Sequence, residues 1–154
     1  MNNKKMIVVG IITLFLIGNL IYSKEKNKEV VDLPNVDEEL LLFFQGNVDF
    51  EKIINYSQGD INEDNREDLV VVYKKDNNNN HMVVVINDKN NMYVTTPKPA
   101  PKEDVKIEFK NIDNKDNMEV IISGSKNGNV GYGVYRFENN ELIDLFGEGM
   151  EACC

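Results

Sequence analysis

A polar loop followed by a short apolar run occurs twice in this sequence, and the repetition limits the folds open to it. The first copy spans residues 59–71 and the second spans residues 111–121, so that Asp60 and Asn111 align 51 residues apart. Each copy has side-chain oxygens at alternate positions and an acid at the ninth, directly before an apolar run. Such runs between polar turns favour strands, so the sequence predicts a mainly β domain with two similar units.

Short apolar segments between turns rich in Asn, Gly and Pro extend this pattern along the chain. They predict strands at residues 52–56, 69–73, 82–86, 92–95, 105–109, 120–122, 132–137 and 142–146. Pro97 to Pro101 predicts a linker that interrupts any ladder. Acids in a first turn and Gly46 as a stop predict one short helix at residues 36–45. A propeller typically needs about 4–8 blades. We therefore expect a small antiparallel sheet domain of two propeller-blade-like repeats, capped by this helix.

The first loop has oxygen spacing that suits a hard cation. Ca²⁺ takes about six to eight oxygen ligands, and the loop offers four side chains and one backbone carbonyl: Asp60, Asn62, Asp64, Asp68 and, through its carbonyl, Arg66. The last acid stands at position nine instead of twelve, which excludes an EF-hand. The loop resembles the calcium loop of FG-GAP repeats, which connects strands of propeller blades. A structural Ca²⁺ is one reading, and a solvated acidic turn is the other.

The second loop departs from this pattern. Its corresponding residues are Asn111, Asp113, Lys115 and Glu119. Lys115 replaces the acid at position five, and its ammonium group would repel a divalent ion. We therefore expect a degenerate, metal-free copy that an internal ion pair holds together.

The chain begins with a hydrophobic segment. Residues 6–22 carry no charge and follow Lys4 and Lys5. A bilayer-spanning helix needs roughly 17–25 residues. A signal peptide has a shorter apolar region of about 7–15 residues and an A-x-A-like cleavage site. The segment thus predicts a single-pass anchor in membrane lipid with the domain outside the cytoplasm, and secretion after cleavage is the alternative.

The acidic composition argues against nucleic acid as a partner, and composition changes along the chain mark its predicted parts. The formal net charge is −9, and Lys4 and Lys5 lie outside the domain, so nucleic acid is not a predicted partner. The predicted parts are an anchor or signal (1–23), a tether (24–35), a β-rich FG-GAP-like domain (36–146) and a flexible tail (147–154). We expect Leu145 and Phe146 to anchor the root of that tail.

The only two cysteines, Cys153 and Cys154, are adjacent in the tail. Their Cα atoms are about 3.8 Å apart across a trans peptide, closer than the roughly 4.4–6.8 Å of ordinary disulfides, so a bridge between them would be strained. Glu148 and Glu151 disfavour the thiolates that disulfide exchange needs. A soft metal displaces the thiol protons outright, and thiolates select soft ions. Met150 is a further candidate ligand for such an ion.

The segment IISGSKNGNVGYGVYRFENNELIDLFGEGMEACC, together with the amino-terminal anchor, resembles the Cys-Cys-COOH (seleno)protein family called SaoC. The resemblance covers most of residues 50–154. Some members of that family carry selenocysteine in the terminal pair, and the family is associated with proposed organometal resistance systems that include transporters. Only Cys153 and Cys154 carry over, as two thiols without a selenol.

These observations lead to one expected function and two alternatives. We expect an anchored protein that binds a thiophilic heavy metal or organometal transiently through Cys153 and Cys154 and passes it to a transporter. The alternatives are a thiol-disulfide relay with a redox partner and a calcium-dependent binding module. No catalytic residue is predicted, and the sequence leaves simple chelation and cleavage of a carbon–metal bond both open.

Overall fold

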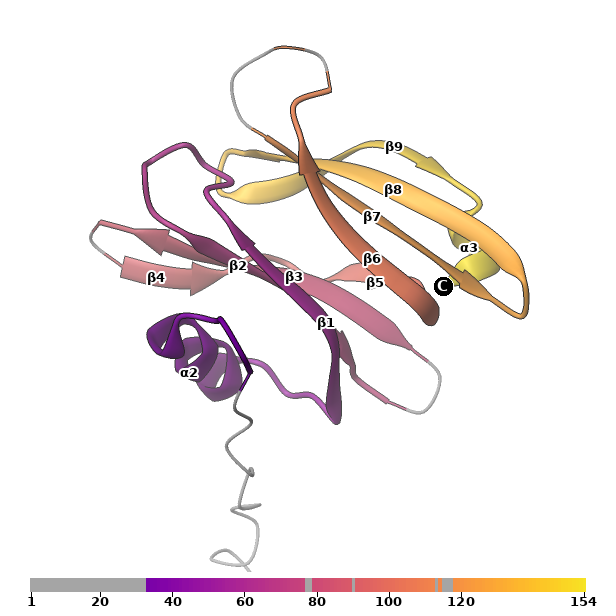
Figure 1. Cartoon of the computed structure of the whole chain (residues 1–154), viewed down its shortest axis with the longest axis horizontal. Helices are drawn as coiled ribbons and strands as arrows, with labels where there is room; N and C mark the ends of the chain where they lie inside the picture. The colour runs from indigo at the N-terminus through magenta and orange to yellow at the C-terminus, as the bar shows by residue number, and fades with distance from the viewer. Residues whose placement is uncertain (1–32, 77–78, 90, 113, 115–117) are drawn as a thin grey trace, which may run out of the picture. The chain divides into compact units, whose positions relative to one another are not determined.

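The computed structural model describes residues 33–76, 79–89, 91–112, 114 and 118–154 (Figure 1). The uncharged segment at residues 6–22 lies outside them, as do Asp113 and Lys115 of the second loop. Three side chains near the carboxyl terminus are also outside the description: Glu148, Glu151 and Cys153. Among the described residues, no helix is both long enough and apolar enough to cross a bilayer.

The predicted short helix is present as α2 (Glu38–Asn47). The side chain of Asp37 caps its start by accepting a hydrogen bond from the backbone N–H of Glu39 at 2.8 Å. This bond satisfies one of the N–H groups that a helix start leaves without an intrahelical partner. The prediction that Gly46 stops the helix was wrong, because α2 includes it and ends one residue later.

Residues 52–100 contain a first sheet whose paired strands are all antiparallel. Its strands are β1 (Lys52–Gly59), β2 (Asp68–Lys74), β3 (Asn80–Asp88), β4 (Asn91–Val94) and β5 (Lys98–Ala100). The order is β1-β2-β3-β4, and β5 pairs with the other end of β3. Strands β2 and β3 are central and almost wholly buried, which explains their continuous runs of apolar residues.

The prediction of a linker at Pro97 to Pro101 was wrong, because part of this segment is the edge strand β5. It pairs with residues 80–82 of β3. A proline is tolerated at a sheet edge, where its missing N–H can be on the solvent side. Between β4 and β5, Thr95 maintains the contact with Val84: its backbone N–H donates to the carbonyl at 2.9 Å, and its Oγ1 accepts from the N–H at 3.0 Å.

Residues 103–148 contain a second antiparallel sheet, in the order β6-β7-β8-β9. Its strands are β6 (Glu103–Lys110), β7 (Glu119–Lys126), β8 (Asn129–Glu138) and β9 (Glu141–Glu148). Two-residue turns join β7 to β8 and β8 to β9, and Asn127, Asn139 and Asn140 in these turns have positive φ. Asn and Gly tolerate that conformation, which fits tight hairpins.

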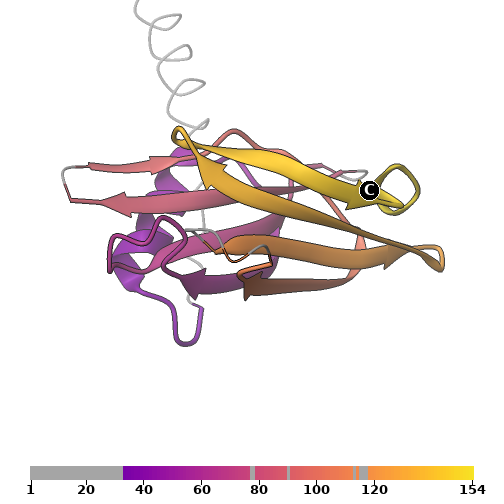
Figure 2. The same cartoon turned by 90° about the horizontal axis from the view of Figure 1, so that it is seen from above.

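Helix α2 covers one face of the first sheet, and the second sheet covers the other (Figures 1 and 2). Alternate residues of β2 point to opposite sides, as the period of a strand requires. Leu69 and Val71 pack in a cluster with Phe44 of α2. Val70 and Val72 pack in the cluster that the two sheets share.

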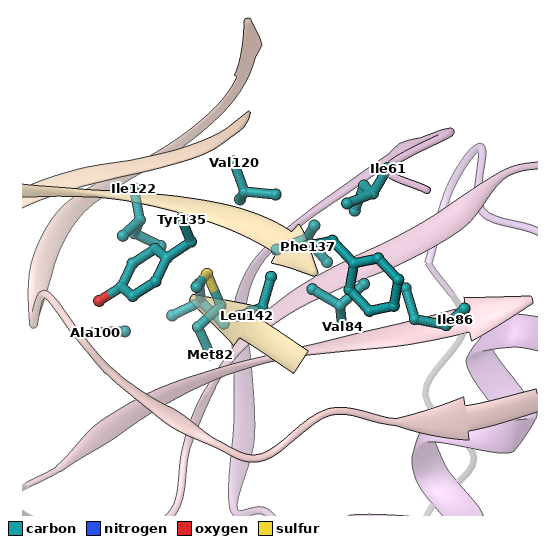
Figure 3. Close-up of a cluster of buried hydrophobic side chains, with 12 residues drawn as sticks. Ile61, Met82, Val84, Ile86, Ala100, Val120, Ile122, Tyr135, Phe137 and Leu142 are labelled. Carbon is teal, nitrogen blue, oxygen red and sulfur yellow. The ribbon is translucent and has the colours of Figure 1, made fainter. Parts of the chain in front are cut away.

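The cluster between the sheets is a closed apolar core (Figure 3). Its members are Ile61, Val70, Val72, Met82, Val84, Ile86, Ala100, Val120, Ile122, Tyr135, Phe137 and Leu142. Figure 3 shows Phe137 of the second sheet beside Val84 and Ile86 of the first. Full burial of one such aliphatic side chain contributes about 1.5–3 kcal/mol, so this cluster is the main contact that joins the sheets. The prediction of a mainly β domain is confirmed.

Candidate functional site

The chain end that carries the cysteine pair is folded against the second sheet (Figure 1). Residues 147–154 were predicted to form a flexible tail, but the first two of them belong to β9 and residues 150–153 form the helical turn α3 (Met150–Cys153). Gly149 joins the two elements with φ of +67°, and a Cβ there would lie 2.5 Å from the carbonyl oxygen of Val130. Glycine fits this junction because it accepts positive φ and close backbone approach.

Two sulfur atoms meet at α3, one on its first residue and one on Cys154, which caps its end. The backbone N–H of Cys154 donates to the carbonyl of Met150 at 3.1 Å, and side chains four residues apart lie on the same face of a helical turn. The Sγ of Cys154 is 3.8 Å from the Sδ of Met150. Both residues are half-buried, and Met150 packs against the core between the sheets.

Lys126 is a functional candidate that the sequence did not indicate. Its Nζ donates to the carbonyl oxygen of Cys154 at 3.0 Å, although the two residues are 28 positions apart. Lys126 ends β7 at the hairpin to β8. The hairpin was predictable, but the docking of α3 beside it was not. The ammonium group adds a positive charge to a chain end whose sequence neighbours are acidic.

The side chain of Asp60 organises the first loop. Its Oδ1 accepts from the backbone N–H of Asp64 at 3.0 Å, and its Oδ2 accepts from that of Asn65 at 2.8 Å. The Oδ1 of Asn62 also accepts from the N–H of Asp64, at 3.1 Å. Oxygens of two predicted calcium ligands therefore converge on one backbone nitrogen.

Arg66 brings a positive charge into the first loop. Its guanidinium group lies 3.4 Å from Oδ2 of Asp64 and 3.8 Å from Oδ1 of Asp88. Its backbone N–H also donates to Oδ1 of Asp64 at 3.0 Å. The sequence predicted only that the carbonyl of Arg66 would contribute. The structure adds a cationic side chain beside one of the four predicted side-chain ligands.

Asp68 is fully buried at the end of the first loop. Its Oδ2 accepts from the N–H of Ile61 at 3.0 Å, and its Oδ1 accepts from the N–H of Asn87 at 2.8 Å. Burial is the largest influence on its pKa and raises it above the ordinary value. The hydrogen bonds from Asn87 and Ile61 act in the opposite direction, and the charge of Asp64 adds to the increase. Asp68 therefore ties the loop to β3.

Glu119 has the equivalent place in the second loop. Its Oε2 accepts from the N–H of Ile112 at 2.8 Å, just as Asp68 accepts from Ile61, and both bonds span seven residues. Its Oε1 accepts from the guanidinium group of Arg136 on β8. This ion pair joins the loop to a neighbouring strand, whereas the internal pair expected around Lys115 lies outside the described residues; Asn111 is exposed.

The structure does not bring the acidic loop residues together as a metal cluster. In the described part of the chain, which excludes the side chains of Glu148, Glu151 and Cys153, no group of three or more His, Cys, Asp or Glu residues is arranged to hold a metal ion. The described residues do bring two soft-metal ligands together, since Sδ of Met150 and Sγ of Cys154 are 3.8 Å apart.

The outer face of the second sheet carries a hollow of about 380 Å³ above the pair of Glu119 and Arg136. Its other walls are apolar and comprise Ile112, Tyr132, Val134, Leu145 and Phe146. Leu145 and Phe146 were expected to anchor the tail, but they are 43% and 53% exposed and face this hollow. The anchoring contact comes from Met150 instead.

No protein-family model matches this chain, and no curated protein or solved structure is similar to it at a significant level. The resemblances in residues 59–71 and 121–154 remain expectations.

Proposed function

We propose that this chain is a membrane-anchored extracytoplasmic protein that binds a thiophilic heavy metal or organometal through Cys153 and Cys154 in a resistance or efflux system. The metal is cargo, which the protein passes to a transporter. The observation that carries the proposal is the placement of Cys154. It is only partly buried, its Sγ lies 3.8 Å from another sulfur, and its carbonyl accepts a hydrogen bond from Lys126.

The chemistry of this chain end supports soft-ion binding over cross-linking. Adjacent cysteines form strained disulfides, whereas thiolate and thioether sulfurs favour soft ions. The whole chain carries a formal charge of −9, which attracts cations. Cys154 is also partly accessible, as the transfer of an ion to a partner requires.

A titration with Hg²⁺ tests this proposal. The full chain in detergent is compared with the double variant Cys153→Ser/Cys154→Ser, with Ala152→Ser as the control on the same turn. We expect the double variant to lose more affinity than the roughly 10–100-fold that loss of an outer-shell partner costs, and the control to bind normally. Equal affinity of the double variant and the parent would end the proposal.

Anchoring through residues 6–22 is part of the proposal and has its own test. Removal of residues 1–23 is expected to release the domain from the membrane fraction. Protease added outside intact cells is expected to digest the domain of the full chain. If the domain is protected in intact cells and digested only after lysis, it faces the cytoplasm and this part of the proposal is wrong.

A thiol-disulfide relay is the second candidate, and the Lys126 contact favours it. An ammonium group bound to the carbonyl of Cys154 offsets the acidic charges that disfavour a thiolate. Rapid exchange with reduced thioredoxin and a potential near those of disulfide oxidoreductases are expected for a relay. A dithiol that stays reduced under mild oxidants would argue for metal binding instead.

We also propose that the two sheets are propeller-blade-like repeats and that the first loop takes a structural Ca²⁺. The shared strand order and the matching bonds of Asp68 and Glu119 support the repeat. The spacing of the loop's side-chain oxygens motivates the cation, and Asp60 and Asn62 lie close enough to accept from one N–H. Calorimetry with Ca²⁺ should detect binding to the parent protein, and Asp64→Ala should abolish it. If the parent protein gives no heat of binding, the loop does not take Ca²⁺.

A further inference from the structure

Met150 and Cys154 form a sulfur pair that the fold itself positions. Met150 packs against the core between the sheets, so its thioether is held from the side of the domain. Cys154 is held from two directions, by its backbone N–H to Met150 at 3.1 Å and by its carbonyl to Lys126 at 3.0 Å. The 3.8 Å separation of Sδ and Sγ therefore reflects contacts on both residues.

This separation matches two ligands of one metal ion. With sulfur–metal distances of about 2.3 Å, as for thiolates on zinc, sulfurs 3.8 Å apart subtend about 110° at the metal. That angle is near tetrahedral. A linear two-coordinate ion would hold its two sulfurs about 4.6 Å apart on the same bond length. The pair is therefore suited to an ion with three or four ligands.

We propose that Met150 is a ligand beside the cysteines and that the site takes a soft monovalent ion of the Cu(I) or Ag(I) class. This inference rests on the proposed function and names its cargo. A thioether is neutral and soft, and it selects Cu(I) over harder ions. On binding, the thiol proton that Cys154 directs at Sδ passes to solvent, and the metal takes its place between the two sulfurs.

Simple core packing is the competing explanation of the contact, and Met150→Leu separates the two. Leucine replaces methionine with little change in volume, typically at a cost below about 1.5 kcal/mol, but it removes the sulfur. Met92→Leu is the matched control, because Met92 is also half-buried and packs against the cluster on the α2 side. Thermal unfolding of each variant checks that the fold is retained.

The experiment is a titration of the full chain in detergent with Ag⁺ against a competing chelator. We expect Met150→Leu to bind Ag⁺ about 10-fold or more weakly, and Met92→Leu to bind like the parent. If Met150→Leu binds like the parent while Cys153→Ser/Cys154→Ser does not, Met150 is no ligand and the proposed function stands. If the double variant also binds like the parent, the proposed function fails as well.

A second readout identifies the ligand atom directly. The chain is produced with selenomethionine, loaded with Cu(I) under reducing conditions and measured by X-ray absorption at the copper edge. Copper bound to Met150 gives a copper–selenium shell, and the same sample of Met150→Leu lacks it. A spectrum of the labelled parent with sulfur neighbours alone would overturn the inference.

Discussion

The guanidinium group of Arg136 is hydrogen-bonded to Oε1 of Glu119, and the two side chains are only 10% and 0% exposed. Glu119 begins β7 and Arg136 lies on the adjacent β8, so the pair links two strands. The other oxygen of Glu119 accepts from Ile112 at 2.8 Å, which also fixes the end of the second loop. One carboxylate thus joins three segments of the chain.

Replacement of Glu119 by Gln should be strongly destabilising. It leaves the guanidinium of Arg136 buried without its carboxylate, and breaking a buried pair costs about 3–5 kcal/mol. Urea denaturation measures the loss. Glu138→Gln is the matched control, because Glu138 lies 3.6 Å from the same guanidinium but is 45% exposed, and exposed pairs contribute about 0–1 kcal/mol. Equal losses in both variants would contradict the structure.

Replacement of Gly124 by Ala should destabilise the second sheet. A Cβ at this position would lie 2.5 Å from Cβ of Pro101 and 2.6 Å from the carbonyl oxygen of Glu103. Such overpacking costs about 1–3 kcal/mol. Gly46→Ala is the control, since no atom outside its chain neighbours and its own helical backbone lies within 4 Å of the added Cβ. In a helix that change should stabilise by about 0.5–1 kcal/mol, so opposite signs are expected in thermal unfolding.

The carboxyl group of Asp68 should give the fold a characteristic pH dependence. Burial raises its pKa above 3.8, so the folded state binds its proton more tightly than the unfolded chain does. The resulting stability is fully present below pH 3.8 and is lost as the pH rises through the raised pKa.

Asp68→Asn tests this dependence. It should lose about 1–3 kcal/mol near neutral pH, because one of the N–H groups of Ile61 and Asn87 then faces an amide NH₂. The advantage of the parent over the variant should grow on acidification toward pH 3.8, as measured by denaturant unfolding at several pH values. An advantage that shrinks over that range would contradict the assignment.

His81 should make a second, opposite contribution. Burial is the first cause that lowers its pKa below 6.5, and the charge of Lys75 acts in the same direction. The stability due to neutral His81 is present above pH 6.5 and falls as the pH drops toward the lowered pKa. Because His81 is the only histidine, an NMR titration reads its pKa directly. His81→Gln should flatten the stability profile across this range, and a measured pKa at or above 6.5 would refute the prediction.

The strands were predictable because the local signals are strong. Valine-rich runs such as residues 69–73 have few alternatives to a buried strand, and Asn139 and Asn140 adopt the positive φ that a tight hairpin needs. The error at Pro97 to Pro101 has a tertiary cause. Strand β3 is long enough for β4 and β5 to share one edge, and no local pattern gives that length.

The sequence singles out the two cysteines of the proposed site, but it does not indicate the contacts around them. The sequence indicates Cys153 and Cys154 through their chemistry, and Met150 through its proximity along the chain. The contact of Lys126 with Cys154 spans 28 residues and depends on where α3 docks. The partner of Glu119 likewise lies 17 residues away on another strand. Such pairings follow from strand order and register, which composition and spacing do not specify.

The matching bonds of Asp68 and Glu119 align β2 with β7, so equivalent sides of the two sheets can be compared. The side of β2 that α2 covers, with Leu69 and Val71, corresponds to the side of β7 that meets the first sheet, with Val120 and Ile122. Equivalent sides of the two sheets therefore point in the same direction, toward α2. Helix α2 covers the outer side of the first sheet, whereas the outer side of the second sheet carries the hollow beside Glu119 and Arg136.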